Sequence, residues 1–558
     1  MKKLKHAVRI ITVTLTSFSL VACEGIFDSL SENPNQSTVK DFYTTPENAN
    51  KGILGIYSYI STPRALGASG IGLMCNRGDE GSARSDYGSP GQYTAALTPS
   101  YYTIVQPYQL FYTAAFQACQ MINVIPDIDF TDESLKNAYL GEAHFLRAFC
   151  HFFLLLHYRN IPLMKDTPAS ATDYRAQATP EESWNFISED LEAARRLLPL
   201  KGFWGSAYPG RVTRGAATAL LGKVYLYRSG IEQYYSEGAK SYYDEAVACF
   251  DAVIKGDDGV YSLVDNYNDN FDIRYENNDE SVFEIQFLGD PVHSAFNPGA
   301  EDSGAWRDSR GFNPPSSKST QDQVMHDWVY DTFVQSRDAD GMTDSRMFGT
   351  LIFDDKAPEI HAKAGDRVTL IDGASFEEFY HGNGFADVNA TAGLYKACGR
   401  KGIDWSLPGE DPGDLMYYWN LRANGLNYPY IRYADVLLMY AEAVVSGGRQ
   451  GSITPLEAVN RVRARVSVAL PPLQAVDMSV IERERILELT HEGHRFFDLL
   501  RWGKVVGWFR ELESIDPNFK QYGQSSYLGF QEGKHEWLPI PIDEVEGNPY
   551  IHTNNPGW

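Results

Sequence analysis

The spacing of apolar residues is the feature that most constrains this fold. Leu135, Tyr139, Ala143 and Leu146 recur every three or four positions, which places their side chains on one face of a helix. Six further blocks repeat this spacing, and a long middle segment interrupts them. The predicted helices cover residues 132–158, 180–198, 212–229, 242–254, 431–445, 455–466 and 481–500.

Capping signals predict where several of these helices begin and end. Thr179 precedes Pro180, which pairs an N-cap side chain with a proline in the first turn. Pro162 disfavours helical geometry in the residue before it, so the first block must stop ahead of it. Gly230 and Gly256 follow the third and fourth blocks and are expected to close them.

The middle segment, residues 256–429, has a different composition. It is rich in Gly, Asn, Asp and aromatic residues, and residues 281–287 have the pattern of a short strand. Long loops in a compact protein are usually functional or disordered, and the many aromatics argue against disorder. The flanking helices resemble tetratricopeptide-type hairpins, although their intervals are too irregular for a 34-residue repeat. The predicted fold is mostly α, with a scaffold of helical hairpins and a large loop-rich, mixed ligand-binding region.

The N-terminus has the pattern of an export signal. Four basic residues precede an apolar run over residues 10–22, which is too short to span a bilayer and fits a signal peptide. The run ends in Leu20-Val21-Ala22-Cys23, which resembles a bacterial lipobox. The sequence therefore predicts cleavage after residue 22, acylation of Cys23 and a polar tether over residues 23–40. An ordinary signal peptide with an incidental cysteine is the alternative.

Charge and cysteine usage exclude several classes of protein. Residues 1–22 hold four basic and no acidic side chains, so their removal changes the formal charge from −24 to −28. Such an acidic chain is repelled by phosphate backbones, which argues against nucleic acid as a partner. The other five cysteines form no CxxC pair and no disulfide framework. Three of them, Cys119, Cys150 and Cys249, fall on helical blocks and are expected to be buried.

Several sequence blocks together resemble the SusD/RagB family of nutrient-uptake lipoproteins. They occur in the expected order and, with the lipobox, span nearly the whole chain. Where the family more often ends in tyrosine, this chain ends in Trp558. The blocks are residues 142–149, 158–163, 211–217, 431–438, 441–443, 482–489, 492–503, 539–541 and 554–558.

The resemblance implies an architecture, a location and a partner. It implies one SusD-like domain over residues 41–558, with a helical scaffold at about 41–255 and 430–510 and a loop-rich region at about 256–429. An irregular segment, residues 511–558, closes the chain. The family further implies a lipid anchor in the outer membrane facing the exterior, a glycan ligand, and a SusC-like TonB-dependent transporter that receives it.

Two alternatives use the same scaffold. The chain is either a peptide- or protein-capture lipoprotein, or a helical scaffold that only stabilises the transporter. A glycan site should expose Trp and Tyr on one face, because sugar C–H faces stack on flat rings. A peptide site should show a deep cavity with few stacking rings, and a pure scaffold should show neither.

Motifs for catalysis or metal binding are weak in this sequence. His491 and His494 are three residues apart, whereas the zincin pattern needs a spacing of four. Asp338, Asp340 and Asp344 resemble part of a calcium loop that lacks its remaining ligands. No carboxylate pair stands out among the 73 acidic residues as a glycosidase centre. We therefore expect a protein that is not an enzyme and uses no cofactor and no metal.

Candidate ligand contacts combine flat rings with polar partners. Trp306 lies among Gly, Ser, Asp and Arg with no apolar neighbours to bury it, so it is expected to be a stacking platform. Two irregular segments supply the remaining candidates for a glycan site: Asn76, Arg77, Asp79 and Tyr101 in the first, and Asn313 beside Trp306 in the second.

Overall fold

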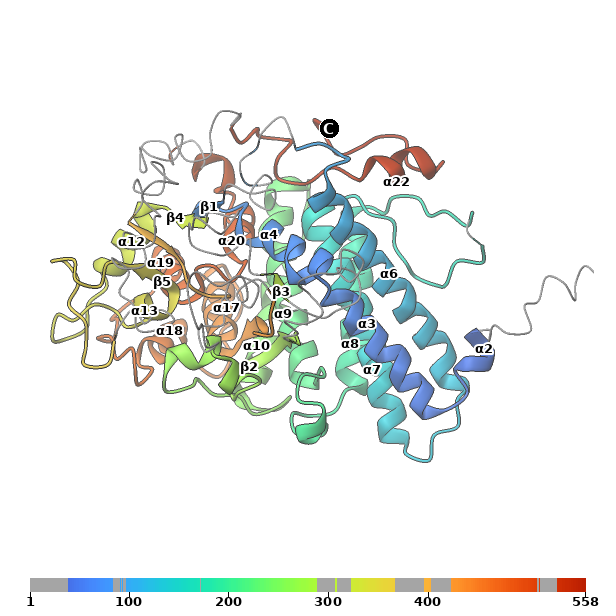
Figure 1. The fold of residues 1–558 in the computed structure, drawn as a ribbon, viewed down its shortest axis with the longest axis horizontal. Coiled ribbons are helices and arrows are strands. Elements are labelled where there is room, and N and C mark those ends of the chain that lie inside the picture. Colours follow the sequence, from blue (N-terminus) through green and yellow to red (C-terminus); the bar gives the residue numbers. More distant parts are fainter. Residues whose placement is uncertain are drawn as a thin grey trace, which may run out of the picture.

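The computed structural model describes residues 39–83, 91, 93, 97–170, 172–288, 307–308, 323–366, 396–402, 423–508, 511 and 529–558. Helices dominate this part of the chain, as the mostly-α prediction requires (Figure 1). The helices of the first half are α2 (Val39–Phe42), α3 (Pro46–Ile60), α4 (Ser69–Cys75), α6 (Tyr102–Val124), α7 (Glu133–Tyr158), α8 (Pro180–Leu197), α9 (Arg214–Tyr235) and α10 (Tyr243–Lys255). Those of the second half are α12 (Asp327–Val334), α13 (Arg346–Thr350), α17 (Tyr433–Val445), α18 (Pro455–Arg463), α19 (Met478–Leu489), α20 (Arg495–Arg501) and α22 (Ile542–Gly547).

The long helices form one continuous stack. Helix α3 packs on α6, α6 on α7, α7 on α8, α8 on α9 and α9 on α10, and α17 and α18 continue the series. Figure 1 shows α3, α6, α7 and α8 side by side at one end, with α12, α13 and α18 at the other. Apolar side chains from all the helices of this series form a shared core. In the described part of the chain, no helix combines the length and the apolar character needed to cross a bilayer.

Local capping chemistry sets several helix ends as predicted. The Thr179 hydroxyl accepts the N–H of Glu182 at 3.2 Å, and the Glu182 carboxylate accepts the N–H of Thr179 at 2.8 Å. This capping box satisfies two N–H groups that the helix itself leaves without partners. Gly256 ends α10 in the left-handed region, with a φ of 81°. Helix α7 ends at Tyr158, ahead of Pro162.

Two predicted helix boundaries are wrong, and tertiary contacts explain both. Gly230 does not close α9, which continues to Tyr235. A Cβ at Gly230 would lie 2.7 Å from Cβ of Arg501, so the glycine allows α20 to pack closely on α9. The predicted helix over residues 481–500 is two helices, α19 and α20. His491 and Gly493 separate them with φ values of 67° and 77°, which helical residues do not adopt.

Short strands hold the described parts of the loop-rich region. A four-stranded sheet has the order β1-β4-β6-β5, and β2 pairs with β8 in an antiparallel ladder that confirms the strand predicted at 281–287. Strand β3 pairs with β7. The strands are β1 (Gly81–Ala83), β2 (Ser281–Ile285), β3 (Arg307–Asp308), β4 (Gln323–Met325), β5 (Leu351–Phe353), β6 (Ala397–Gly399), β7 (Ala423–Asn424) and β8 (Tyr428–Arg432).

A second, smaller apolar core is built around the four-stranded sheet. Phe333, Phe348 and Ile352 belong to it, and Leu487 of α19 joins it from the helical stack. Cys119, Cys150 and Cys249 are buried, as predicted, and so are Cys75 and Cys398; these five cysteines form no disulfide with one another.

Candidate functional site

Three of the predicted ligand contacts lie in the interior, in the segment that follows α4. Asn76, Arg77 and Asp79 are buried. Arg77 donates to the backbone carbonyls of His535 and Glu536 at 2.8 and 3.1 Å. These side chains therefore face the protein core rather than solvent in this structure.

Arg77 and Asp79 hold separate parts of the chain together. The Arg77 guanidinium lies 3.9 Å from the centre of the Phe496 ring, and Asp79 pairs with Arg495 at 2.7 Å. Sequence composition alone did not reveal this role, because an Asn-Arg-Gly-Asp segment looks the same in an exposed loop and in an interior turn. Their assignment as ligand contacts stays a prediction from the sequence.

The remaining candidates differ in what the structure says of them. Tyr101 is half-buried, directly precedes α6, and packs against the helical core. Its ring centroid lies 5.4 Å from that of Tyr102, which is 38% exposed. Trp306, Asn313 and the lipidation candidate Cys23 lie outside the described residues, so their assignments stay predictions.

A buried lattice of acids and bases fixes the loop-rich region on the helices. Glu488 of α19 accepts from Arg346 and Arg432 at 3.0 Å and from Arg465 at 2.6 Å. Lys401 pairs with Glu492 at 2.7 Å. All of these side chains are almost completely shielded from solvent.

The charge states in this lattice follow from the competition between burial and pairing. Burial alone would raise the pKa of Glu488, but the facing guanidinium groups of Arg465 and Arg432 hold it far below its usual range. Burial also lowers the pKa of Lys401 to about 8, although Glu492 opposes that shift. A sequence signal for this lattice is the run Glu482-Arg483-Glu484-Arg485, which puts four consecutive charged residues inside a predicted helix.

His494, one of the two histidines of the zinc motif, lies beside a second buried cluster. Burial and the nearby Lys223 ammonium lower the pKa of His494 well below its usual value. Asp435 pairs with Lys223 at 3.3 Å and with Arg485 at 2.9 Å. No group of three or more His, Cys, Asp or Glu suited to a metal ion occurs among the residues that the structure describes.

The calcium-loop fragment forms an ordinary capped turn. The Asp338 carboxylate accepts the N–H groups of Asp340 and Met342, each at 2.9 Å. It also pairs with Lys363 at 3.3 Å. The turn already supplies this carboxylate with donors and a cation, which is a structural use of the motif.

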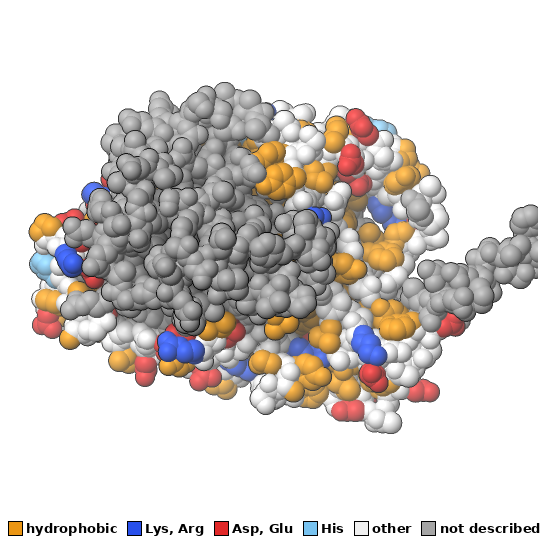
Figure 2. Space-filling view, viewed as in Figure 1, with side chains coloured by type: hydrophobic (Ala, Val, Ile, Leu, Met, Phe, Trp, Pro, Cys, Tyr) orange, Lys and Arg blue, Asp and Glu red, His pale blue; other side chains and the backbone are white. Residues whose placement is uncertain are grey.

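An exposed aromatic loop joins α8 to α9. We refer to residues 198–213 as the α8–α9 loop. Leu200, Phe203 and Tyr208 are each 44% exposed, and the Phe203 ring meets the Trp204 indole edge to face at 5.1 Å. Figure 2 shows that hydrophobic side chains are exposed among acidic and basic ones over the helical part of one face.

A stacked cation holds this loop in place. The Arg211 guanidinium lies 4.3 Å from the centre of the Trp204 ring and 4.9 Å from that of Tyr139, and the two rings are nearly parallel. Arg211 in turn pairs with buried Glu142 at 2.8 Å. The indole N–H donates to the carbonyl of Val212 at 3.1 Å. These contacts hold Trp204 and Arg211 in place, and preorganisation of this kind lowers the entropy cost of binding at a surface.

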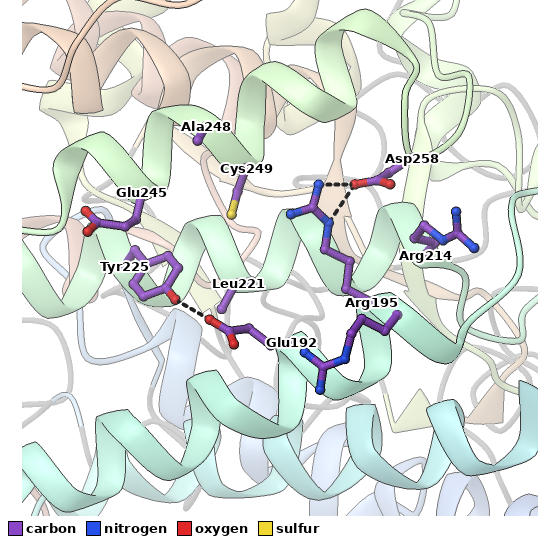
Figure 3. Close-up of a pocket in the computed structure, with 10 residues that line it drawn as sticks. Glu192, Arg195, Arg214, Leu221, Tyr225, Glu245, Ala248, Cys249 and Asp258 are labelled. Carbon is purple, nitrogen blue, oxygen red and sulfur yellow. Dashed lines mark hydrogen bonds and ion pairs between the residues drawn. The ribbon is translucent and has the colours of Figure 1, made fainter. Parts of the chain in front are cut away.

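A groove of about 590 Å³, lined by both charged and apolar side chains, lies between α8, α9 and α10 (Figure 3). Its charges come from all three helices and from the turn after α10. Two pairings cross it: Tyr225 donates to Glu192 at 3.1 Å, and Arg195 pairs with Asp258 at 2.7 Å. The lining residues are Glu192, Arg195, Arg196, Arg214, Leu221, Tyr225, Glu245, Ala248, Cys249 and Asp258.

Together, the helical stack, the buried lattice and the exposed rings define an α-helical scaffold with solvent-facing surfaces suited to ligand binding. The chain belongs to the SusD family. The model of that family, described as "SusD family", matches residues 280–558, and a model described as "Starch-binding associating with outer membrane" matches residues 75–226.

Individual proteins resemble this chain over nearly its whole length. SusD-like protein P2 of Formosa agariphila is 25% identical, and the match covers 100% of both chains. A SusD superfamily protein from Bacteroides vulgatus is 24% identical with a TM-score of 0.68, covering 93% of this chain and 100% of its own. Surface glycan-binding protein A from Bacteroides thetaiotaomicron, solved with laminarihexaose, is 17% identical with a TM-score of 0.64, covering 92% and 100%.

Proposed function

We propose that this protein is a surface lipoprotein of the outer membrane that binds an extracellular glycan and delivers it to a SusC-like TonB-dependent transporter. Membership of the SusD family is the observation that carries the proposal. A protein of the same fold was solved with a laminarin-type oligosaccharide, which supports a glycan as the ligand class.

The exposed rings of the α8–α9 loop give this proposal physical support. Phe203 and Tyr208 offer flat apolar faces to solvent on a loop fixed by Arg211. A pyranose ring can stack its C–H face on such a surface. Exposed rings are the feature that distinguishes a glycan site from a peptide cavity, so the loop favours glycan over peptide capture. Trp306 remains a second platform proposed from the sequence.

Calorimetry on the full-length protein in detergent tests the ligand class. Laminarihexaose, cellohexaose, xylohexaose and maltohexaose form the panel, with a hexapeptide as the competing class. We expect at least one hexasaccharide to bind. The double variant Phe203→Ala, Tyr208→Ala should lower its affinity at least tenfold, and Tyr550→Ala, which removes another exposed ring, should not. Binding of the peptide alone would refute the proposal.

The anchor and the partner require separate experiments. Cys23→Ala should abolish acyl labelling and release the protein from the outer-membrane fraction. The lipidated protein should co-purify with a TonB-dependent transporter from that membrane. If the Cys23→Ala variant keeps both the label and its membrane location, the anchor is elsewhere.

We also propose that the bound glycan leaves chemically unchanged. The buried carboxylates Glu488, Glu492 and Asp435 are engaged with arginine or lysine and closed to solvent. Such groups have no access to a glycosidic bond. Incubation of purified protein with its glycan should release no reducing ends. Release that a single Asp or Glu substitution abolishes would overturn this part of the proposal.

A further inference from the structure

The groove between α8, α9 and α10 separates its charges along its length. Figure 3 shows Arg195 and Arg214 toward one end, together with Asp258, and Glu192 and Glu245 toward the other. The α9 residues that line it run from Arg214 to Tyr225, which spans about 16 Å at the rise of an α-helix. Its volume of about 590 Å³ falls within the range of small-molecule sites.

The cationic end has guanidinium groups available to a ligand. Arg195 is committed to Asp258. In the described part of the chain, neither Arg196 nor Arg214 forms an ion pair, and Arg214 only donates its Nε to the carbonyl of Leu198 at 3.1 Å. A guanidinium matches a carboxylate through two parallel hydrogen bonds. Because the chain has a formal charge of −24, two such cations lining one hollow mark it as a site for an anion.

The acidic end requires hydrogen-bond donors. Glu192 accepts from the Tyr225 hydroxyl, and Glu245 forms no ion pair within the described ranges. Ionised carboxylates only accept hydrogen bonds, so the ligand must supply donors here. Each sugar hydroxyl can turn its proton toward a carboxylate, whereas a peptide brings a carbonyl acceptor with every N–H. Leu221 and Ala248 line the groove between the two ends and can meet a sugar's apolar C–H face.

The balance of charge limits the ligand to one anionic group. Three arginines and three acidic residues line the groove, so its formal charge is zero. A polyanion would place its further charges against Glu192 and Glu245. A ligand with one carboxylate at the arginine end and a neutral, hydroxylated remainder satisfies both ends.

We infer that this groove is a second carbohydrate-binding site, selective for a short oligosaccharide that carries a single uronate. The carboxylate lies against Arg196 and Arg214, and sugar hydroxyls donate to Glu192 and Glu245. The choice of a carbohydrate rests on the proposed function. The groove is lined by none of the exposed rings of the α8–α9 loop, so the two surfaces are tested independently.

Calorimetry with two matched trisaccharides tests the inference on the full-length protein in detergent. Glucuronosyl-xylobiose carries one carboxylate, and xylotriose is its neutral counterpart. We expect the uronate to bind at least tenfold more tightly than xylotriose, with an affinity that falls as salt is raised. Arg196→Met should lower the uronate affinity at least tenfold. Arg449→Met, which removes the same charge from an exposed site, should leave it unchanged.

Each contrary result has a definite meaning. The inference fails if the uronate does not bind or if xylotriose binds equally well. It also fails if Arg196→Met and Arg449→Met have the same affinity for the uronate. Trialanine also carries one carboxylate. If it binds as tightly as glucuronosyl-xylobiose or more tightly, the groove is a peptide site. If the groove does not bind the uronate but Arg196→Met still binds a hexasaccharide, the inference about the groove is wrong and the proposed glycan function is unaffected.

Discussion

Replacing Arg346 with methionine should detach the loop-rich region from the helical stack. Arg346 lies on α13 and is completely buried, and it pairs with Asp344 at 2.8 Å, Glu484 at 2.6 Å and Glu488 at 3.0 Å. Burial alone would lower the pKa of Arg346, but the facing carboxylates raise it well above its usual value. The native protein therefore contains a fully charged, buried arginine at this position.

The size of the effect follows from the carboxylates left behind. Removing one partner of a buried ion pair typically costs about 3–5 kcal/mol, because the remaining charge stays buried without compensation. Glu488 keeps Arg432 and Arg465, and Glu484 keeps Arg463, so the loss falls mainly on Asp344. A cost of about 3 kcal/mol raises the population of a locally open state by roughly two orders of magnitude.

Hydrogen exchange followed by mass spectrometry measures that opening segment by segment. In Arg346→Met, amides of α12, β5 and β6 should exchange about a hundredfold faster, while α7 and α8 stay unchanged. Arg346→Lys keeps the charge without the planar fork and should give an intermediate rate. Arg449→Met is the matched control, since Arg449 is 88% exposed and lies 3.7 Å from Asp244, a surface pair worth at most about 1 kcal/mol. Equal exchange in Arg346→Met and Arg449→Met would refute the reasoning.

Three further predictions test other features of the chain. Burial raises the pKa of Glu80 to about 8, so the native state keeps a proton that the unfolded chain releases above about pH 4.5. Stability should therefore fall between pH 5 and 8, and melting curves of Glu80→Gln should show a smaller fall. In chemical denaturation, Gly230→Ala should lower the free energy of unfolding by about 1–3 kcal/mol, because the added methyl group meets the backbone of α20. Gly55→Ala, where the space is open, should raise the free energy of unfolding by up to about 1 kcal/mol. Trp306→Ala should weaken hexasaccharide binding at least tenfold with little change in melting temperature, and a loss of several degrees would make the indole structural.

Local chemistry was enough to predict most of the scaffold. The N-cap at Thr179 and the helix end at Gly256 depend on neighbours within a few residues, and both were predicted from the sequence. Gly230 was misassigned because its function is to admit Arg501, which lies far along the chain. Sequence spacing carries no information about such a contact.

The candidate site was harder to predict for the same reason. Arg77 and Asp79 have the composition of a binding loop, yet their partners are His535 and Arg495, more than 400 residues away. The groove was also missed, because Arg196, Arg214 and Glu245 belong to three helices whose shared face appears only after packing. Their isolated positions in the sequence resemble those of ordinary solvated charges.

The pairing of β2 with β8 has a consequence for how this protein can change. Ser281 lies opposite Arg432, so the chain leaves the helical stack and returns to it at one place. A segment with adjacent ends can be replaced without moving the structure that carries it. Two residues inside the segment, Arg346 and Lys401, would have to be kept, because removing them takes a cation away from their buried partner carboxylates. Grafting this segment from one chain to another, with those two residues retained, is therefore a practical way to vary the segment that carries the proposed Trp306 platform.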